Sequence, residues 1–96
     1  MGHYIGGLVK ESEYNPMFNV QLKTTGGRVQ GITACWGSSS TCRSMQGAGD
    51  GWWTTRLPVT VKAGRVYRWV VYYKINGVGF KHVLDSRAIR ANPNAF

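Results

Sequence analysis

The chain has 96 residues and a mass of 10.7 kDa, which is the size of one small domain and excludes a large multidomain enzyme. Hydrophobic residues make up 43% of a composition typical of globular chains, and no apolar run approaches the roughly 20 residues of a membrane-spanning helix. The formal net charge is +8, and residues 56–96 carry eight basic side chains against one acidic one. This charge favours polyanionic partners such as nucleic acid or acidic glycan, or merely keeps an aromatic-rich surface soluble.

The first half of the chain shows the two-residue periodicity of β-strands. Residues 1–10 lack the apolar segment of a signal peptide, so we expect a cytosolic chain or a mature domain without its export signal. Residues 18–23 alternate between apolar and polar side chains and predict a half-buried strand. Gly26-Gly27 predicts a hairpin turn into a second strand over residues 28–36.

Two cysteines follow, with a Gly/Ser-rich segment between them. Cys35 and Cys42 lie seven positions apart, so a disulfide can close a small loop; two free, buried thiols are the alternative. A zinc site would need two further ligands, and His3 and His82 are not spaced as partners. We therefore expect no metal and no cofactor, and the predicted disulfide favours secretion to an oxidising compartment.

The second half of the chain predicts further strands. Residues 57–63 alternate, with Pro58 indicating an edge position or a strand start. Residues 65–75 form the longest predicted strand, and Asn76-Gly77 predicts a hairpin to its partner at 79–85. Residues 86–91 can form one helical turn, and 90–96 are expected to be a loose tail. Short strands at this spacing predict a single all-β domain over residues 1–96, an antiparallel β-sandwich.

Adjacent tryptophans mark the candidate binding site. Trp52 and Trp53 point to opposite faces if they lie in a strand, so one can be core while the other faces outward; the sequence does not say which. An exposed indole is a flat plate that stacks on sugar rings or on nucleobases. Candidate polar or flanking contacts are Asp50, Arg56, Arg68 and Tyr72. The alternative is that both indoles pack beneath loops.

Candidate catalytic groups are sparse. Glu11 and Glu13 have no evident partners to flank a reacting bond, and Ser86 lacks the sequence context of a nucleophile. A basic nuclease that uses His3 or His82 with Arg68 is conceivable, but two unlinked histidines do not specify one. We therefore expect a protein that is not an enzyme.

Residues 51–80 resemble the end of the N-terminal domain of β-1,3-glucan recognition proteins, family 39 of the carbohydrate-binding modules. The similarity comprises a Gly–x–Trp–Thr strand, a turn with glycine, an aromatic strand and a glycine-containing return. The matching residues are Gly51, Trp53, Thr54, Gly64, Tyr67, Trp69, Lys74, Gly77, Gly79 and Phe80. The resemblance covers about a third of the chain, and the cysteine loop departs from it. It implies an immunoglobulin-like sandwich that binds a β-glucan, with Trp53 as a contact.

These observations together predict a secreted carbohydrate-binding domain that recognises a polysaccharide by aromatic stacking and polar contacts. The alternatives are a basic nucleic-acid-binding β domain, whose affinity would fall steeply with salt, and a small basic ribonuclease or toxin. The sequence leaves the glycan and the oligomeric state open.

Overall fold

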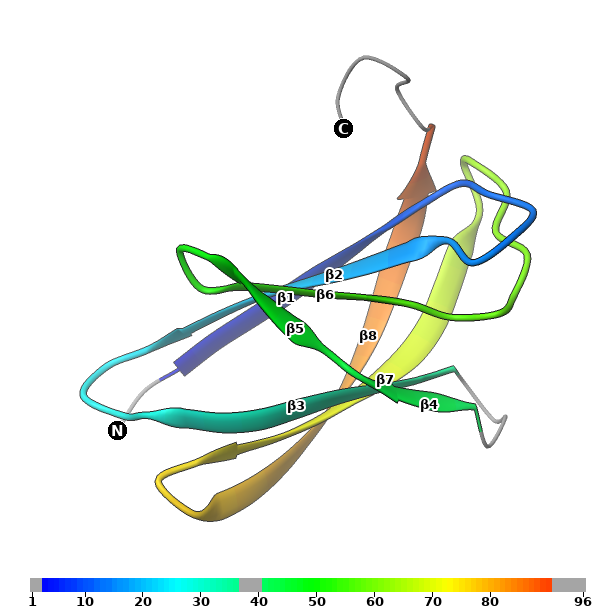
Figure 1. The fold of residues 1–96 in the computed structure, drawn as a ribbon. Helices are drawn as coiled ribbons and strands as arrows, with labels where there is room; N and C mark the ends of the chain where they lie inside the picture. Colours follow the sequence, from blue (N-terminus) through cyan, green and yellow to red (C-terminus); the bar gives the residue numbers. More distant parts are fainter. Residues whose placement is uncertain (1–2, 37–40, 91–96) are drawn as a thin grey trace.

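The computed structural model describes residues 3–36 and 41–90, and all the regular elements in these ranges are β-strands (Figure 1). The strands are β1 (His3–Lys10), β2 (Met17–Thr24), β3 (Val29–Trp36), β4 (Cys42–Ser44), β5 (Gln46–Gly49), β6 (Trp52–Arg56), β7 (Val66–Ile75) and β8 (Val78–Ile89). The all-β class is therefore confirmed. This part of the chain contains no helix of the length and apolarity that crossing a membrane requires.

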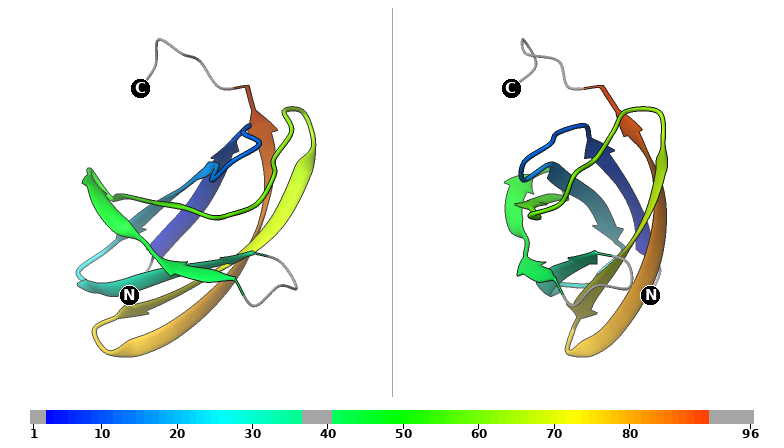
Figure 2. Two further views of the ribbon diagram at one scale, coloured as in Figure 1. Left: turned by 45° about the vertical axis from the view of Figure 1, so that its right-hand side comes forward. Right: turned by 90° about the vertical axis from the view of Figure 1, so that its right-hand side faces the viewer.

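The strands form one sheet rather than two, in the order β4-β3-β7-β8-β1-β2-β6-β5. The sheet curls until it nearly closes into a barrel, as the right-hand view of Figure 2 shows. The two-layered, immunoglobulin-like sandwich is not confirmed. The strand pairs are antiparallel apart from β1 and β8, which run parallel and pair at only two positions.

A single segment joins the two ends of the sheet. Residues 42–44 pair with β3, and residues 46–49 pair with β6, so the chain changes partners at Met45. The side chain of Met45 is buried, and its N–H donates to the carbonyl of Ile32 at 2.8 Å. A strand that bends across in this way removes most of the unpaired edge that an open sheet would leave.

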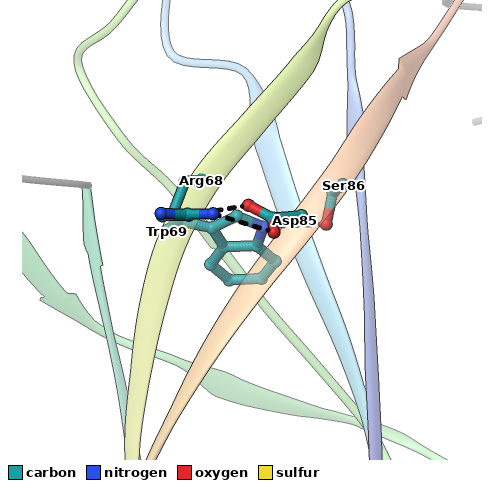
Figure 3. A network of polar contacts seen from close by, with 4 residues as sticks. All are labelled: Arg68, Trp69, Asp85 and Ser86. Carbon is teal, nitrogen blue, oxygen red and sulfur yellow. Dashed lines mark hydrogen bonds and ion pairs between the residues drawn. The ribbon is translucent and has the colours of Figure 1, made fainter.

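Trp69 lies at the centre of the barrel with no exposed surface. Its indole meets the ring of Phe18 edge-on, with centroids 5.1 Å apart, and its Nε1 donates to Oγ of buried Ser86 at 2.9 Å (Figure 3). A Cβ at Gly7 would lie 2.6 Å from Trp69 Cζ2 and 2.8 Å from a methyl group of Leu84. Gly7 therefore leaves the space that the indole occupies.

Three local predictions are wrong. Gly26-Gly27 does not join a hairpin, because β2 pairs with β1 and β6 while β3 pairs with β4 and β7. Residues 57–63 do not form the predicted strand and contain only an isolated bridge from Val61 to Ser12. Pro58 has no N–H to donate to a neighbouring strand. The apolar alternation reflects the burial of Leu57 and Val61. Residues 86–89 extend β8 instead of forming a helical turn. The Ala88 N–H donates to the backbone carbonyl of Arg65, and Ala88 pairs with Val9 of β1.

Two other predictions are confirmed. Asn76 and Gly77 join β7 to β8 with φ values of 50° and 82°, the left-handed conformation that a two-residue hairpin of this type requires. Cys35 and Cys42 are direct cross-strand neighbours in β3 and β4 and form a disulfide. The predicted loose tail is described only at Arg90; residues 91–96 lie outside the described part.

We predict that the packing around Trp69 contributes strongly to the free energy of unfolding of the domain. Trp69→Ala should lower the free energy of unfolding by about 3–5 kcal/mol, because it leaves a large cavity. Gly7→Ala should lower it by about 1–3 kcal/mol, because the added methyl group overlaps the indole. Gly47→Ala is the matched control, since a Cβ there would lie 3.8 Å from its nearest neighbour, Trp53. Urea denaturation measures all three, and a Gly7→Ala variant as stable as Gly47→Ala would contradict the packing argument.

We also predict that the disulfide contributes about 2–3 kcal/mol, because it closes a short loop in the unfolded chain. Unfolding of the native protein would be compared with that of Cys35→Ala/Cys42→Ala in the presence and absence of reductant. Reductant should lower the stability of the native protein alone. Equal stability of the oxidised protein and the variant would rule out a stabilising role.

Candidate functional site

The structure places the two adjacent tryptophans on opposite faces of β6. Trp53 pairs with buried Val20, packs against the hydrophobic core, and covers Gly47 with its ring. Trp52 therefore faces outward, where it pairs with Gln21 of β2 and Gly49 of β5 and is partly exposed. Both tryptophans are partly exposed, and Trp52 is the one whose side chain lies on the outer face of the barrel.

Aromatic and amide side chains follow one row across the outer face of β1, β2 and β6. Gln21 pairs with Trp52 on one side and with Gly6 on the other. The hydroxyl of Tyr4 lies 2.6 Å from where a Gly6 Cβ would be, so the Tyr4 ring folds over that glycine. The outer strands of the three are about 10 Å apart. The row thus has an aromatic ring at each end and an amide between them.

A second polar row lies beside the first. Asn19 pairs with Thr54, which also pairs with Gln46 of β5. The Thr54 hydroxyl is buried and makes no hydrogen bond to any described residue. An unsatisfied polar group of this kind is uncommon in folded proteins. We call the outward-facing set of five residues the Trp52 face; it consists of Tyr4, Asn19, Gln21, Trp52 and Thr54.

Asp50 and Arg56 lie at the two ends of β6. Asp50 is exposed in the turn from β5 and has a φ of 54°. Arg56 faces outward, and its guanidinium donates to the carbonyl of Asn15 at 3.0 Å. Both predicted residues therefore flank the Trp52 face, with Arg56 already engaged by the backbone.

Arg68 and Tyr72 belong to a different surface. Both lie on the outer face of β7, which is separated from β6 in the sheet by β8, β1 and β2. The Arg68 guanidinium donates to both carboxylate oxygens of Asp85, at 2.9 and 3.3 Å (Figure 3). This hydrogen-bonded pairing lowers the pKa of Asp85 and raises that of Arg68. The six predicted contacts therefore do not form one site.

Tyr72 stands in a hollow of about 560 Å³ on this second surface. We call this hollow the Tyr72 groove; it is lined by Gln30, Gly31, Thr33, Tyr72, Tyr73, Lys74, Gly79, Phe80 and Lys81. Lys81 pairs directly with Tyr72, and Lys74 pairs with Gly79. β7 and β8 form two sides of the groove, and a β-bulge in β3, between Val29 and Ile32, forms the third.

The histidines do not join Arg68. The Nε2 atom of His3 lies 2.7 Å from the hydroxyl of Tyr73, a buried residue, and its ring meets that of Phe80 edge-on. Burial raises the pKa of Tyr73. His82 pairs with buried Val71, so it lies on the inner face of β8, whereas Arg68 lies on the outer face of β7. The arrangement that the nuclease alternative needs is therefore absent from the described residues.

Sequence reasoning missed Tyr4, Asn19 and Gln21 on the Trp52 face, as well as Lys81 in the groove. The alternation over residues 18–23 does place Asn19 and Gln21 on one face. It cannot show that β6 lies beside them, because that pairing joins residues more than 30 positions apart.

Comparisons with protein-family models, with curated proteins and with solved structures gave no match. The resemblance of residues 51–80 to β-1,3-glucan recognition domains therefore stays a prediction from the sequence.

Proposed function

We propose that this protein is a secreted, non-catalytic polysaccharide-binding domain that holds its ligand on the Trp52 face. The observation that carries the proposal is the row of Tyr4, Gln21 and Trp52 across three neighbouring strands. Sugar rings offer apolar C–H faces that stack on aromatic rings and hydroxyl groups that bond to amides. A row with an aromatic ring at each end and an amide between them fits this chemistry.

The chemistry of the Trp52 face favours a neutral glycan. Its five members carry no ionic side chain, and two basic residues lie at its margin: Lys23, which pairs with Tyr4, and Arg56, which donates to the carbonyl of Asn15. A nucleic-acid surface would need a track of basic side chains along the aromatic rings to neutralise successive phosphates. Within this class we propose a β-glucan, which is the ligand that the resemblance of residues 51–80 implies. The disulfide supports an extracellular location, because such bonds persist in oxidising compartments.

The decisive experiment compares the two adjacent tryptophans. Trp52→Ala should weaken binding to insoluble β-1,3-glucan by roughly 1–3 kcal/mol, by analogy with base–aromatic stacking, and should leave thermal unfolding unchanged. Trp53→Ala should instead lower the stability, because Trp53 packs against the core. Pull-down and calorimetry, with chitin and mannan as further polysaccharides, measure the effect.

The same binding should change little between about 50 and 200 mM salt, because neutral contacts are not screened. Single-stranded DNA and RNA are measured beside the glycans as controls. A Trp52→Ala variant that binds every glycan as the native protein does, or a glycan affinity that falls more than about tenfold with salt, would overturn the proposal.

A separate prediction concerns the buried hydroxyl of Thr54 and the stability of the protein. Thr54→Val removes a buried hydroxyl that lacks a partner, so stability should stay the same or rise by up to about 1 kcal/mol. Thr24→Val is the matched control, because the Thr24 hydroxyl donates to the carbonyl of Gly27 at 2.8 Å and its loss should destabilise by about 1 kcal/mol. Urea denaturation of both variants checks this. A Thr54→Val variant as unstable as Thr24→Val would show that the hydroxyl has a partner in solution.

A further inference from the structure

The Tyr72 groove is lined by two glycines, Gly31 and Gly79, and the backbone conformation favours glycine at only one of them. Gly31 has a φ of 146° in the bulge of β3, so its backbone conformation favours glycine. Gly79 has no such φ, and a Cβ built on it would meet nothing within 4 Å. Glycine inside a strand weakens it and often marks a place where a ligand approaches closely. The space above Gly79 is therefore open to an occupant from outside the chain.

Two positive charges flank that space. Lys74 lies opposite Gly79, and Lys81 lies opposite Tyr72, a residue that is 44% exposed. Within the described residues, these three side chains make no hydrogen bond or ion pair. Two other basic residues of the same face are engaged: Arg68 pairs with Asp85, and Arg87 donates to the carbonyl of Gly64. The unpaired positive charge of this face therefore gathers at the groove.

The groove combines these charges with groups suited to a sugar. The Tyr72 ring offers a stacking surface, and the hydroxyl of Thr33 and the amide of Gln30 line the same hollow. The Gln30 oxygen accepts from the Gly77 N–H, which holds the side chain in place and leaves its amide N–H groups for a ligand. A volume of about 560 Å³ lies within the range of sites that hold small ligands.

We propose that the Tyr72 groove binds an anionic sugar residue, carboxylated or sulfated, of an acidic polysaccharide. The ring of the sugar stacks on Tyr72 above Gly79, and its anionic group lies between Lys74 and Lys81. The choice of a glycan rests on the proposed function; the anion site itself rests on the groove alone.

The outer face of β7 and β8 favours a single sugar residue over a nucleic-acid strand. Strands of nucleic acid bind to successive aromatic side chains along a basic track. Among the described residues, Tyr72 is the one aromatic residue that the strand register places on the outer face of β7 and β8. Val70, Val83 and Asp85 lie farther along the same face. Apolar side chains and a carboxylate would interrupt a path of phosphates.

The test uses the full chain with three polymers of the same backbone: dextran, carboxymethyl-dextran and dextran sulfate. We expect binding to at least one charged dextran, with an affinity at least about tenfold above that for dextran itself. Gly79→Val should place a side chain in the groove without loss of stability, since valine favours strands and a Cβ at this position meets no atom within 4 Å. Both Gly79→Val and Lys74→Gln/Lys81→Gln should weaken the binding by about tenfold or more.

Lys62→Gln/Arg65→Gln is the matched control, because it removes the same charge from exposed positions outside the groove. It should change the affinity by less than about threefold. Trp52→Ala should retain the binding to charged dextran, which separates this site from the Trp52 face.

Three outcomes would overturn the proposal. The first is an equal loss in the Lys62→Gln/Arg65→Gln control, which would indicate diffuse attraction by net charge. The second is native affinity in Gly79→Val. The third is tighter binding of an oligothymidylate that is weakened by the same groove variants, which would assign the groove to nucleic acid. Failure of glucan binding with retention of groove binding would instead overturn only the function proposed for the Trp52 face.

Discussion

The position of Trp69 sets the geometry of the whole barrel. A buried indole is large, and its N–H needs an acceptor where water is excluded. Ser86 on β8 supplies the acceptor, and Gly7 on β1 supplies the room. The Ser86 hydroxyl in turn lies 3.4 Å from the carbonyl of Gly7, so one polar contact connects the two strands where they share few backbone pairs. The boundary between β1 and β8 is thereby bridged by the side chain of Ser86, which also accepts the hydrogen bond from Trp69.

The parts of the fold that could be predicted from the sequence are those that depend on neighbouring residues in the chain. Strand alternation and the Asn76-Gly77 turn are local signals, and both identify β7 and β8. β1 shows no such signal, because Gly6 and Gly7 occupy positions where a side chain would reveal the period. The partners of β2 and β3 were also hidden, since Gly26-Gly27 leads β3 away from β2. A closed sheet depends on long-range pairs, such as β4 with β3 and β5 with β6, that no local pattern records.

The candidate site could be predicted only in part, for the same reason. Period two requires that Trp52 and Trp53 face apart, but the choice between them depends on which face of β6 meets Val20. The resemblance of residues 51–80 points to Trp53, whereas the register leaves Trp52 accessible. Arg68 and Tyr72 share a face with each other and not with Trp52, which follows from four strand pairings and not from any spacing along the chain.

The barrel also explains how one small chain can present two surfaces of different chemistry. Its interior takes one side of the longer strands, so each of these has only its outer residues left for binding. Those residues include neutral amides, a hydroxyl and aromatic rings on β1, β2 and β6, with Lys23 and Arg56 at their margin, whereas on β7 and β8 they bring Lys74 and Lys81 together beside Tyr72. Because screening limits the reach of exposed charges to about 10 Å, the lysines of the Tyr72 groove act mainly on what lies in the groove. Separate ligand preferences on the two surfaces are therefore physically compatible within a domain of 96 residues.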